Sequence, residues 1–179
     1  DHRDLHSFPT RRSSDLQQQI FMRALDMLEI YDDSKTYIVD KKLEDIVAEM
    51  RAIVKKDMPY KDIPQLPDLR QKFMDAYGKV LENATAPVMQ SINDAKERVV
   101  EVVEQKEYAA EKKPKYIELF IEISDGASKC NNISILRSYA DKAGALKIRL
   151  LNEMDALDAE IARKKAEEAQ QGSGGEPAE

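Results

Sequence analysis

Apolar residues recur every three or four positions along most of this chain, and this periodicity is the strongest constraint on its fold. The longest periodic stretch runs from Pro67 to about Tyr108. Glycine and proline, which mark the frequent turns of β-sandwiches and β-barrels, number only 6 and 7 in 179 residues. The β-branched pairs Val99-Val100 and Val102-Val103 stand inside the helical period, where packing overrides their weak strand preference. We therefore predict an all-α fold of antiparallel helices.

Breaks in the periodicity divide the chain into separate helices. Asp32-Asp33-Ser34 is expected to end the first helix and to cap the second. Prolines make the segment over 57–66 a loop, because they cannot continue a helix. The predicted helices cover residues 17–31, 36–56, 67–108 and 113–126, and a last helix starts after Asn131-Asn132, whose side chains can cap it.

Pro87 lies in the middle of the long central helix. Proline lacks the backbone N–H of an interior helical residue, and its ring opposes the carbonyl of Asn83. Two interpretations fit, one kinked helix or two stacked helices. We favour a long kinked central helix because the apolar stripe keeps its phase across Pro87.

The last predicted helix carries a narrow apolar stripe with near-heptad spacing, which is typical of a coiled coil. We predict that this stripe is an interaction seam for partner helices, within this chain or on another chain. The seam consists of Leu136, Tyr139, Ala143, Leu146, Leu150, Met154, Leu157 and Ile161.

The two ends of the chain differ from its periodic part. Residues 1–16 (DHRDLHSFPTRRSSDL) correspond to the conceptual translation of a common sequencing-library adapter. We therefore expect them to be non-native, and the natural sequence to be cut near Gln17 from a longer protein. Residues 166–179 contain Gly-Ser-Gly-Gly and lack apolar spacing, which is typical of a flexible tail or linker. The predicted helical bundle or coiled-coil region covers 17–165.

The residues that carry common enzyme chemistry are missing from the periodic part. Both histidines, His2 and His6, lie in the adapter-like segment, so the usual general base and the commonest metal ligand are lost. The pair Gly78-Lys79 stands inside a helical stretch and not in the G-x-x-x-x-G-K-[ST] pattern of a phosphate-binding loop. Cys130 has no histidine to activate it. We predict no catalytic, cofactor-binding or metal-binding residue, and no enzyme activity in this fragment.

Net charge and apolar content limit the classes of partner that this chain can bind. The formal net charge is −6, and acidic residues adjoin every basic cluster, so DNA contact is only weakly supported. No apolar run approaches the roughly 18–20 residues that cross a bilayer, and we expect no membrane partner. A single cysteine is typical of a reducing compartment, so we expect a cytoplasmic location. The basic clusters are Lys41-Lys42, Lys55-Lys56, Lys112-Lys113 with Lys115, and Arg163-Lys164-Lys165.

Two stretches resemble a known family: YIVDKKLEDIVAEMRAIVKKDMPYKDIPQLPDL (37–69) and CNNISILRSYADKAGALKIRLLNEMD (130–155). Over about residues 20–165, the chain resembles the C-terminal helical region of the BrxC-type large P-loop ATPase of BREX phage-exclusion systems. The resemblance implies a cytoplasmic phage-defence parent that binds and hydrolyses ATP with Mg²⁺ at a site upstream of this fragment.

The resemblance also implies a role for the fragment itself. It would be a non-catalytic assembly or interaction region, with no cofactor of its own, that contacts other helices or defence-system subunits. The alternatives are a helical arm that contacts DNA and a structural coiled-coil segment of an unrelated large cytoplasmic protein.

Overall fold

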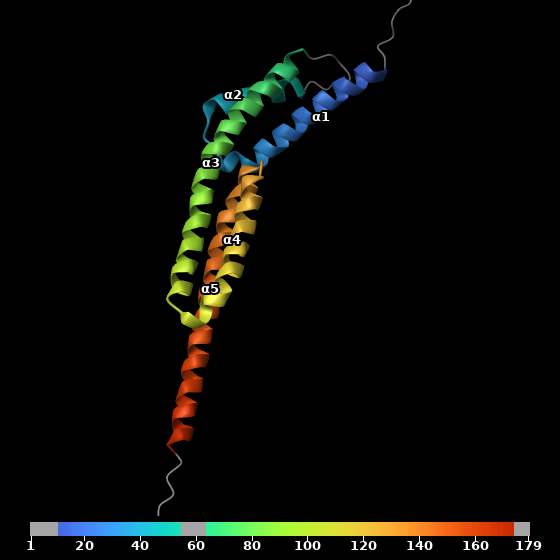
Figure 1. Ribbon diagram of the computed structural model, residues 1–179. Coiled ribbons are helices and arrows are strands. Elements are labelled where there is room, and N and C mark those ends of the chain that lie inside the picture. The colour runs from blue at the N-terminus through green and yellow to red at the C-terminus, as the bar shows by residue number, and fades with distance from the viewer. Residues whose placement is uncertain (1–10, 55–63, 174–179) are drawn as a thin grey trace, which may run out of the picture. The chain divides into compact units, whose positions relative to one another are not determined.

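The computed structural model describes residues 11–54 and 64–173, with side chains from residue 15 onward. In these residues every regular element is helical, which confirms the predicted all-α fold (Figure 1). The elements are α1 (Arg11–Ser34), η1 (Lys35–Tyr37), α2 (Lys41–Val54), α3 (Gln65–Glu104), η2 (Glu107–Lys112), α4 (Lys113–Ser128) and α5 (Ile133–Gly172), where η marks a 3₁₀ turn.

The helices form two compact units, and α3 and α5 contribute to both. The described residues up to Thr85, with 131–135, belong to the first unit. The described residues of 86–130 and 136–173 belong to the second unit. Each unit buries its own set of apolar side chains, so each core is considered by itself.

The core of the first unit joins α1, α2 and the beginning of α3. The stripe predicted on α2 is confirmed, because Leu43, Ile46, Val47 and Met50 are buried and Ile53 and Val54 are partly buried. On α3, the rings of Phe73 and Tyr77 stack with centroids 5.5 Å apart. The other buried members are Phe21, Ala24, Leu28, Tyr31, Ile38, Leu66, Leu69, Ala76 and Ile133.

The connection between α1 and α2 differs from the prediction. α1 runs through Asp32-Asp33 to Ser34, and the Ser34 side chain makes no capping hydrogen bond. Instead, the Asp40 carboxylate accepts a hydrogen bond from the Leu43 amide at 2.8 Å and caps α2 at its first turn. α1 ends at Ser34, within the predicted break, but the predicted cap and the helix start at residue 36 were wrong, because the turn η1 and extended Ile38 come between the helices.

Asn132 caps α5, as the sequence predicted. Its Oδ1 accepts hydrogen bonds from the amides of Ser134 at 2.9 Å and Ile135 at 3.2 Å. The same oxygen accepts a hydrogen bond from the hydroxyl of Ser34 at 3.2 Å. Both Ser34 and Asn132 are buried, so this bond ties the end of α1 to the start of α5 inside the first unit.

The second unit contains α3 from Ala86, then η2, α4, and α5 from Leu136. Short connections make successive helices antiparallel neighbours, and Figure 1 shows α4 alongside α5. All three helices contribute to the core. Its buried residues are Val88, Ile92, Ala95, Val99, Val103, Ala109, Tyr116, Phe120, Ala127, Leu136, Ala143, Leu146, Leu150 and Met154.

α3 is one continuous helix of 40 residues with Pro87 inside it, so a single helix is confirmed over two stacked ones. The helix starts at Gln65, within the loop predicted over 57–66, whose residues 57–63 lie outside the described part. Pro67 lies in the first turn, where its missing N–H costs little. The helix ends at Glu104, earlier than the predicted end near Tyr108, and η2 follows it.

The helices extend past both predicted limits of the helical region. α1 begins at Arg11 and so includes part of the segment 1–16. α5 continues to Gly172, beyond the predicted start of the tail at Ala166. The residues after Lys165 are Ala, Glu and Gln, which form helix without an apolar face. Residues 1–10 and 174–179 lie outside the described part of the chain.

Candidate functional site

The predicted seam divides into a buried part and a half-buried part along α5. Leu136, Ala143, Leu146, Leu150 and Met154 are buried in the core of the second unit. Tyr139, Leu157 and Ile161 are only half-buried. The buried part of the seam therefore packs against helices of this chain. Contact of Leu157 and Ile161 with a helix of another chain stays a prediction.

Helices of the second unit cover the seam only as far as about Leu157. Residues 162–172 of α5 are all exposed, although they remain helical. Figure 1 shows this part of α5, in red, extending past the turn between α3 and α4. Leu157 and Ile161 thus stand where the intramolecular core gives way to a helix without a neighbour in the second unit.

A polar cluster fixes α4 to α5 just before this point. The Glu153 carboxylate accepts hydrogen bonds from Lys112 Nζ at 3.0 Å and from the Tyr116 hydroxyl at 3.1 Å. The bond from Lys112 holds the pKa of Glu153 below its usual value. Burial, together with Glu153, raises the pKa of Tyr116 to about 12. At neutral pH, Glu153 is therefore a charged acceptor and Tyr116 a neutral donor.

A second carboxylate fixes the turn η2 to α5. Asp158 accepts hydrogen bonds from Lys106 Nζ and from the Tyr108 hydroxyl. The bond with Lys106 lowers the pKa of Asp158 and raises the pKa of Lys106. Burial raises the pKa of Tyr108. A carboxylate whose pKa is lowered is a poor general base near neutral pH, so this arrangement suits a structural contact.

This cluster of Lys106, Lys112, Tyr108, Tyr116, Glu153 and Asp158 was not predicted from the sequence. The partners Lys112 and Glu153 lie 41 residues apart, and Lys106 and Asp158 lie 52 apart. No spacing rule within one helix connects residues at such separations. Only the antiparallel packing of α4 and η2 against α5 brings them together.

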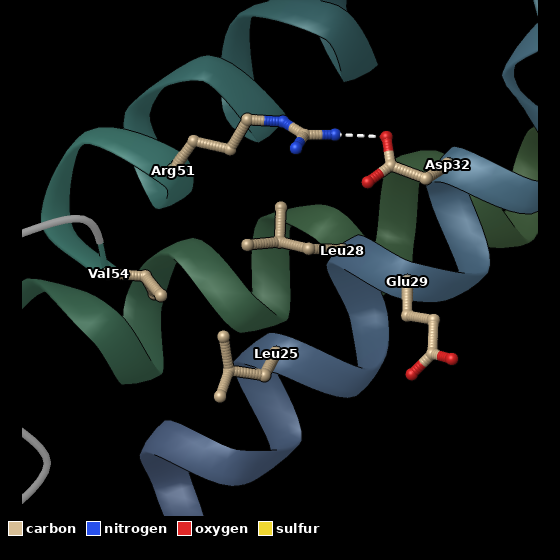
Figure 2. A pocket seen from close by; sticks show the side chains of 6 residues that line it. All are labelled: Leu25, Leu28, Glu29, Asp32, Arg51 and Val54. Carbon is tan, nitrogen blue, oxygen red and sulfur yellow. Dashed lines mark hydrogen bonds and ion pairs between the residues drawn. The ribbon is translucent and has the colours of Figure 1, made fainter.

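A pocket of about 460 Å³ lies between α1 and α2 in the first unit (Figure 2). Apolar side chains from both helices, Leu25 and Leu28 on α1 and Val54 on α2, surround it. Figure 2 shows Arg51 and Asp32 joined by an ion pair above these apolar groups. The remaining lining residue is Glu29.

The chemistry available in this α1–α2 pocket is limited to apolar contact. Arg51 and Asp32 neutralise each other, and Glu29 is exposed and points away from Leu28 in Figure 2. The described residues that line the pocket include no pair of nucleophile and base. We therefore assign no catalytic role to it.

The other candidate residues of the sequence lie within a helix or just after the end of one. Gly78 and Lys79 are exposed within α3, as predicted, and form no phosphate-binding loop. Cys130 is half-buried after the end of α4. Among the described residues, no group of three or more His, Cys, Asp and Glu side chains is placed to hold a metal ion.

The basic clusters are interleaved with acidic partners. Lys113 pairs with Glu104, and Lys164 pairs with Glu160 at 3.1 Å. Lys41 approaches Asp45 at 3.8 Å. Lys55 and Lys56 lie outside the described residues. No helix in residues 11–54 or 64–173 combines the length and apolar character that a bilayer span requires.

Comparison with protein families finds a match for one segment of the chain. Residues 95–157 match the family model described as the BrxC seventh domain. This segment is therefore similar to the BrxC seventh domain. It spans the end of α3, η2, α4 and α5 as far as Leu157, and so includes the stretch 130–155 quoted above but does not reach 37–69. No solved structure matches the chain.

Proposed function

We propose that this chain is a non-catalytic assembly region from the C-terminal part of a BREX-type phage-defence P-loop ATPase that acts in the cytoplasm. The observation that carries the proposal is the match of residues 95–157 to the BrxC seventh domain. The word "seventh" indicates a multidomain parent, and ATP and Mg²⁺ would bind in another of its domains. The all-helical architecture of the matched segment agrees with a scaffolding role.

The polar cluster supports the non-catalytic part of the proposal. The carboxylates of Glu153 and Asp158 have lowered pKa values and are occupied by Lys112 and Lys106. Groups used as general bases near neutral pH need the opposite shift. These carboxylates therefore serve to hold the helices together.

The end of the seam supports the assembly part. Leu157 and Ile161 continue the line of the buried residues Leu150 and Met154 into the exposed part of α5. Pairing with α5 of a second copy would remove the remaining apolar surface of both side chains from water. Because two residues per copy contribute little area, we expect weak self-association of the isolated chain, with a dissociation constant of about 0.1–1 mM.

Sedimentation equilibrium over a range of concentrations tests this proposal. We expect the wild-type chain to associate and the double variant Leu157→Glu/Ile161→Glu to remain monomeric, because two charges per copy would enter the contact. Ile148→Glu is the matched control, since Ile148 lies on α5 with 57% of its surface exposed. A wild-type chain that stays monomeric, or equal loss in the control, would contradict assembly through the seam. ATP turnover by the isolated chain would contradict the non-catalytic role.

A further inference from the structure

A second open surface lies between α4 and α5 in the second unit. This α4–α5 groove has a volume of about 390 Å³. Its apolar residues are Leu119 and Ile123 of α4 and Ala145 and Leu146 of α5. Leu119 and Ile123 are only half-buried, although both lie on the side of α4 that faces the groove. The groove is therefore an apolar strip that no side chain of this unit fills.

Specific contacts close the groove at both ends and leave its middle open. At one end, the ring of Tyr139 lies so close to Gly126 that a Cβ there would be 2.6 Å from Tyr139 Cε1. At the other end, Glu153 of α5 holds Tyr116 of α4 at 3.1 Å. Between these contacts lie about two and a half turns of α4 and about three and a half turns of α5, which carry the residues that line the groove.

The two walls of the open part carry opposite charges. Glu122 stands on the α4 wall, and Lys142 and Arg149 stand on the α5 wall. Among the described residues no ion pair joins Glu122 to either base, whereas Glu153 and Asp158 are paired further along α5. Lys142 instead lies over the Tyr139 ring at 4.5 Å. The groove thus offers one negative and one positive edge to an occupant.

We propose that the α4–α5 groove binds an amphipathic helix of a partner protein, with acidic residues along the edge that faces α5 and basic residues along the edge that faces α4. An apolar strip between two antiparallel helices receives a third helix through residues spaced three and four apart. The charged edges favour a partner whose apolar face has acids on one side and bases on the other. The proposal goes beyond self-association through Leu157 and Ile161, because it concerns another face of the unit.

The exposed end of α5 from a second copy is a poor match for this groove. Its cations Arg163 and Lys164 pair with Glu167 and Glu160 of the same helix, so this part of α5 does not separate its charges into an acidic edge and a basic edge. The two walls therefore favour a partner helix with separated charges.

Peptide binding measured by fluorescence anisotropy tests the proposal. The probe is a synthetic stapled helix of about 15 residues with leucines along one face, glutamates on one edge and lysines on the other; the staple is needed because short helices are marginal in water. The reference probe carries glutamines on both edges. We expect the wild-type chain to bind the charged probe about five- to tenfold more tightly than the glutamine probe.

Variants of the chain show whether the walls cause this preference. Arg149→Glu should abolish the preference. The exchange Glu122→Arg/Lys142→Glu/Arg149→Glu reverses the charge of both walls and should restore it, because the probe can bind with its direction reversed. Lys79→Glu, an exposed position on α3, is the control for a simple change of charge and should leave the preference unchanged. Circular dichroism of each variant verifies that the helices remain.

The proposal would be overturned if the wild-type chain bound neither probe or bound both equally. It would also be overturned if the preference for the charged probe survived Arg149→Glu. Self-association that is lost in Arg149→Glu but kept in Leu157→Glu/Ile161→Glu would make a second copy the occupant and would also reject a separate partner. Because the probes do not contact Leu157 or Ile161, a failure here leaves the assembly proposal standing.

Discussion

Gly126 lies in α4 at a position where a larger side chain would collide with a neighbouring ring of the second unit. Its Cα faces the ring of Tyr139, and a Cβ would lie 2.6 Å from Cε1 and 2.9 Å from Cζ. Contacts this short force the ring to move. The ring also carries the contact with Lys142 at 4.5 Å, so its displacement disturbs the closed end of the groove.

We expect Gly126→Ala to lower the free energy of unfolding by about 1 kcal/mol, because overpacking outweighs the gain in helix propensity. Gly144→Ala is the matched control: no atom lies within 4 Å of its added Cβ, and we expect it to stabilise by about 0.5–1 kcal/mol. Urea unfolding followed by circular dichroism measures both. Equal stabilisation by the two substitutions would show that Tyr139 moves aside without cost.

Glu153 makes the stability of the second unit depend on acid pH. Its pKa in the folded protein is lowered from the ordinary value of 4.5, chiefly by Lys112. A lowered pKa means that the contribution is complete above the unfolded value and is lost as the pH falls through the folded value. We expect Glu153→Gln to destabilise the chain by less than about 1 kcal/mol at pH 7, because the pair is partly exposed.

The difference between wild type and Glu153→Gln should shrink as the pH falls below about 4.5. Thermal unfolding at a series of pH values between 7 and about 3 measures this difference. The substitution Glu118→Gln, at an exposed position on α4, controls for a general loss of negative charge. A difference that stays constant with pH would show that Glu153 contributes through shape alone.

Among the elements, α3 tolerates a proline in its interior. Pro87 has no N–H to donate to the carbonyl of Asn83, yet the helix continues on both sides. Close to it, the hydroxyl of Thr85 donates a hydrogen bond to the carbonyl of Leu81 at 2.7 Å, a contact that often bends helices. Pro87 is exposed, so the proline adds no side chain to either core.

We expect Pro87→Ala to raise the free energy of unfolding by about 1–3 kcal/mol, because it restores the missing hydrogen bond and removes the clash of the ring. Pro114→Ala, in the first turn of α4, is the matched control and should change stability by less than about 0.5 kcal/mol. Chemical denaturation measures both. A destabilised Pro87→Ala variant would show that the fold requires the proline at this position.

At the scale of the whole chain, one apolar stripe serves two cores. Along α3, the stripe from Leu69 to Val103 keeps its phase, yet Leu69, Phe73 and Tyr77 are buried in the first unit and Val99 in the second. Between them, Val80 and Ala84 are only half-buried. The periodicity predicts which face of the helix is buried, but it does not predict which helices cover that face.

The seam on α5 shows the same division. Its even spacing suggests one continuous contact surface, but Leu146 and Leu150 pack inside the chain while Ile161 emerges from it. The α1–α2 pocket and the polar cluster were not predicted, because each is formed by residues from different elements, with Asp32 and Arg51 19 residues apart and Lys106 and Asp158 52 apart. The BrxC resemblance came from running similarity, and the family match confirms it over 95–157.

The sequence alone determined that the chain is helical, which faces of its helices are buried and that Asn132 caps α5. These are local properties: a period of 3.6 residues and the first-turn amides depend only on residues a few positions apart. Tertiary packing alone decided that Glu153 meets Lys112, that Ser34 meets Asn132, and how far the seam is covered. Such contacts depend on which helix lies beside which, and no local pattern of residues encodes that choice.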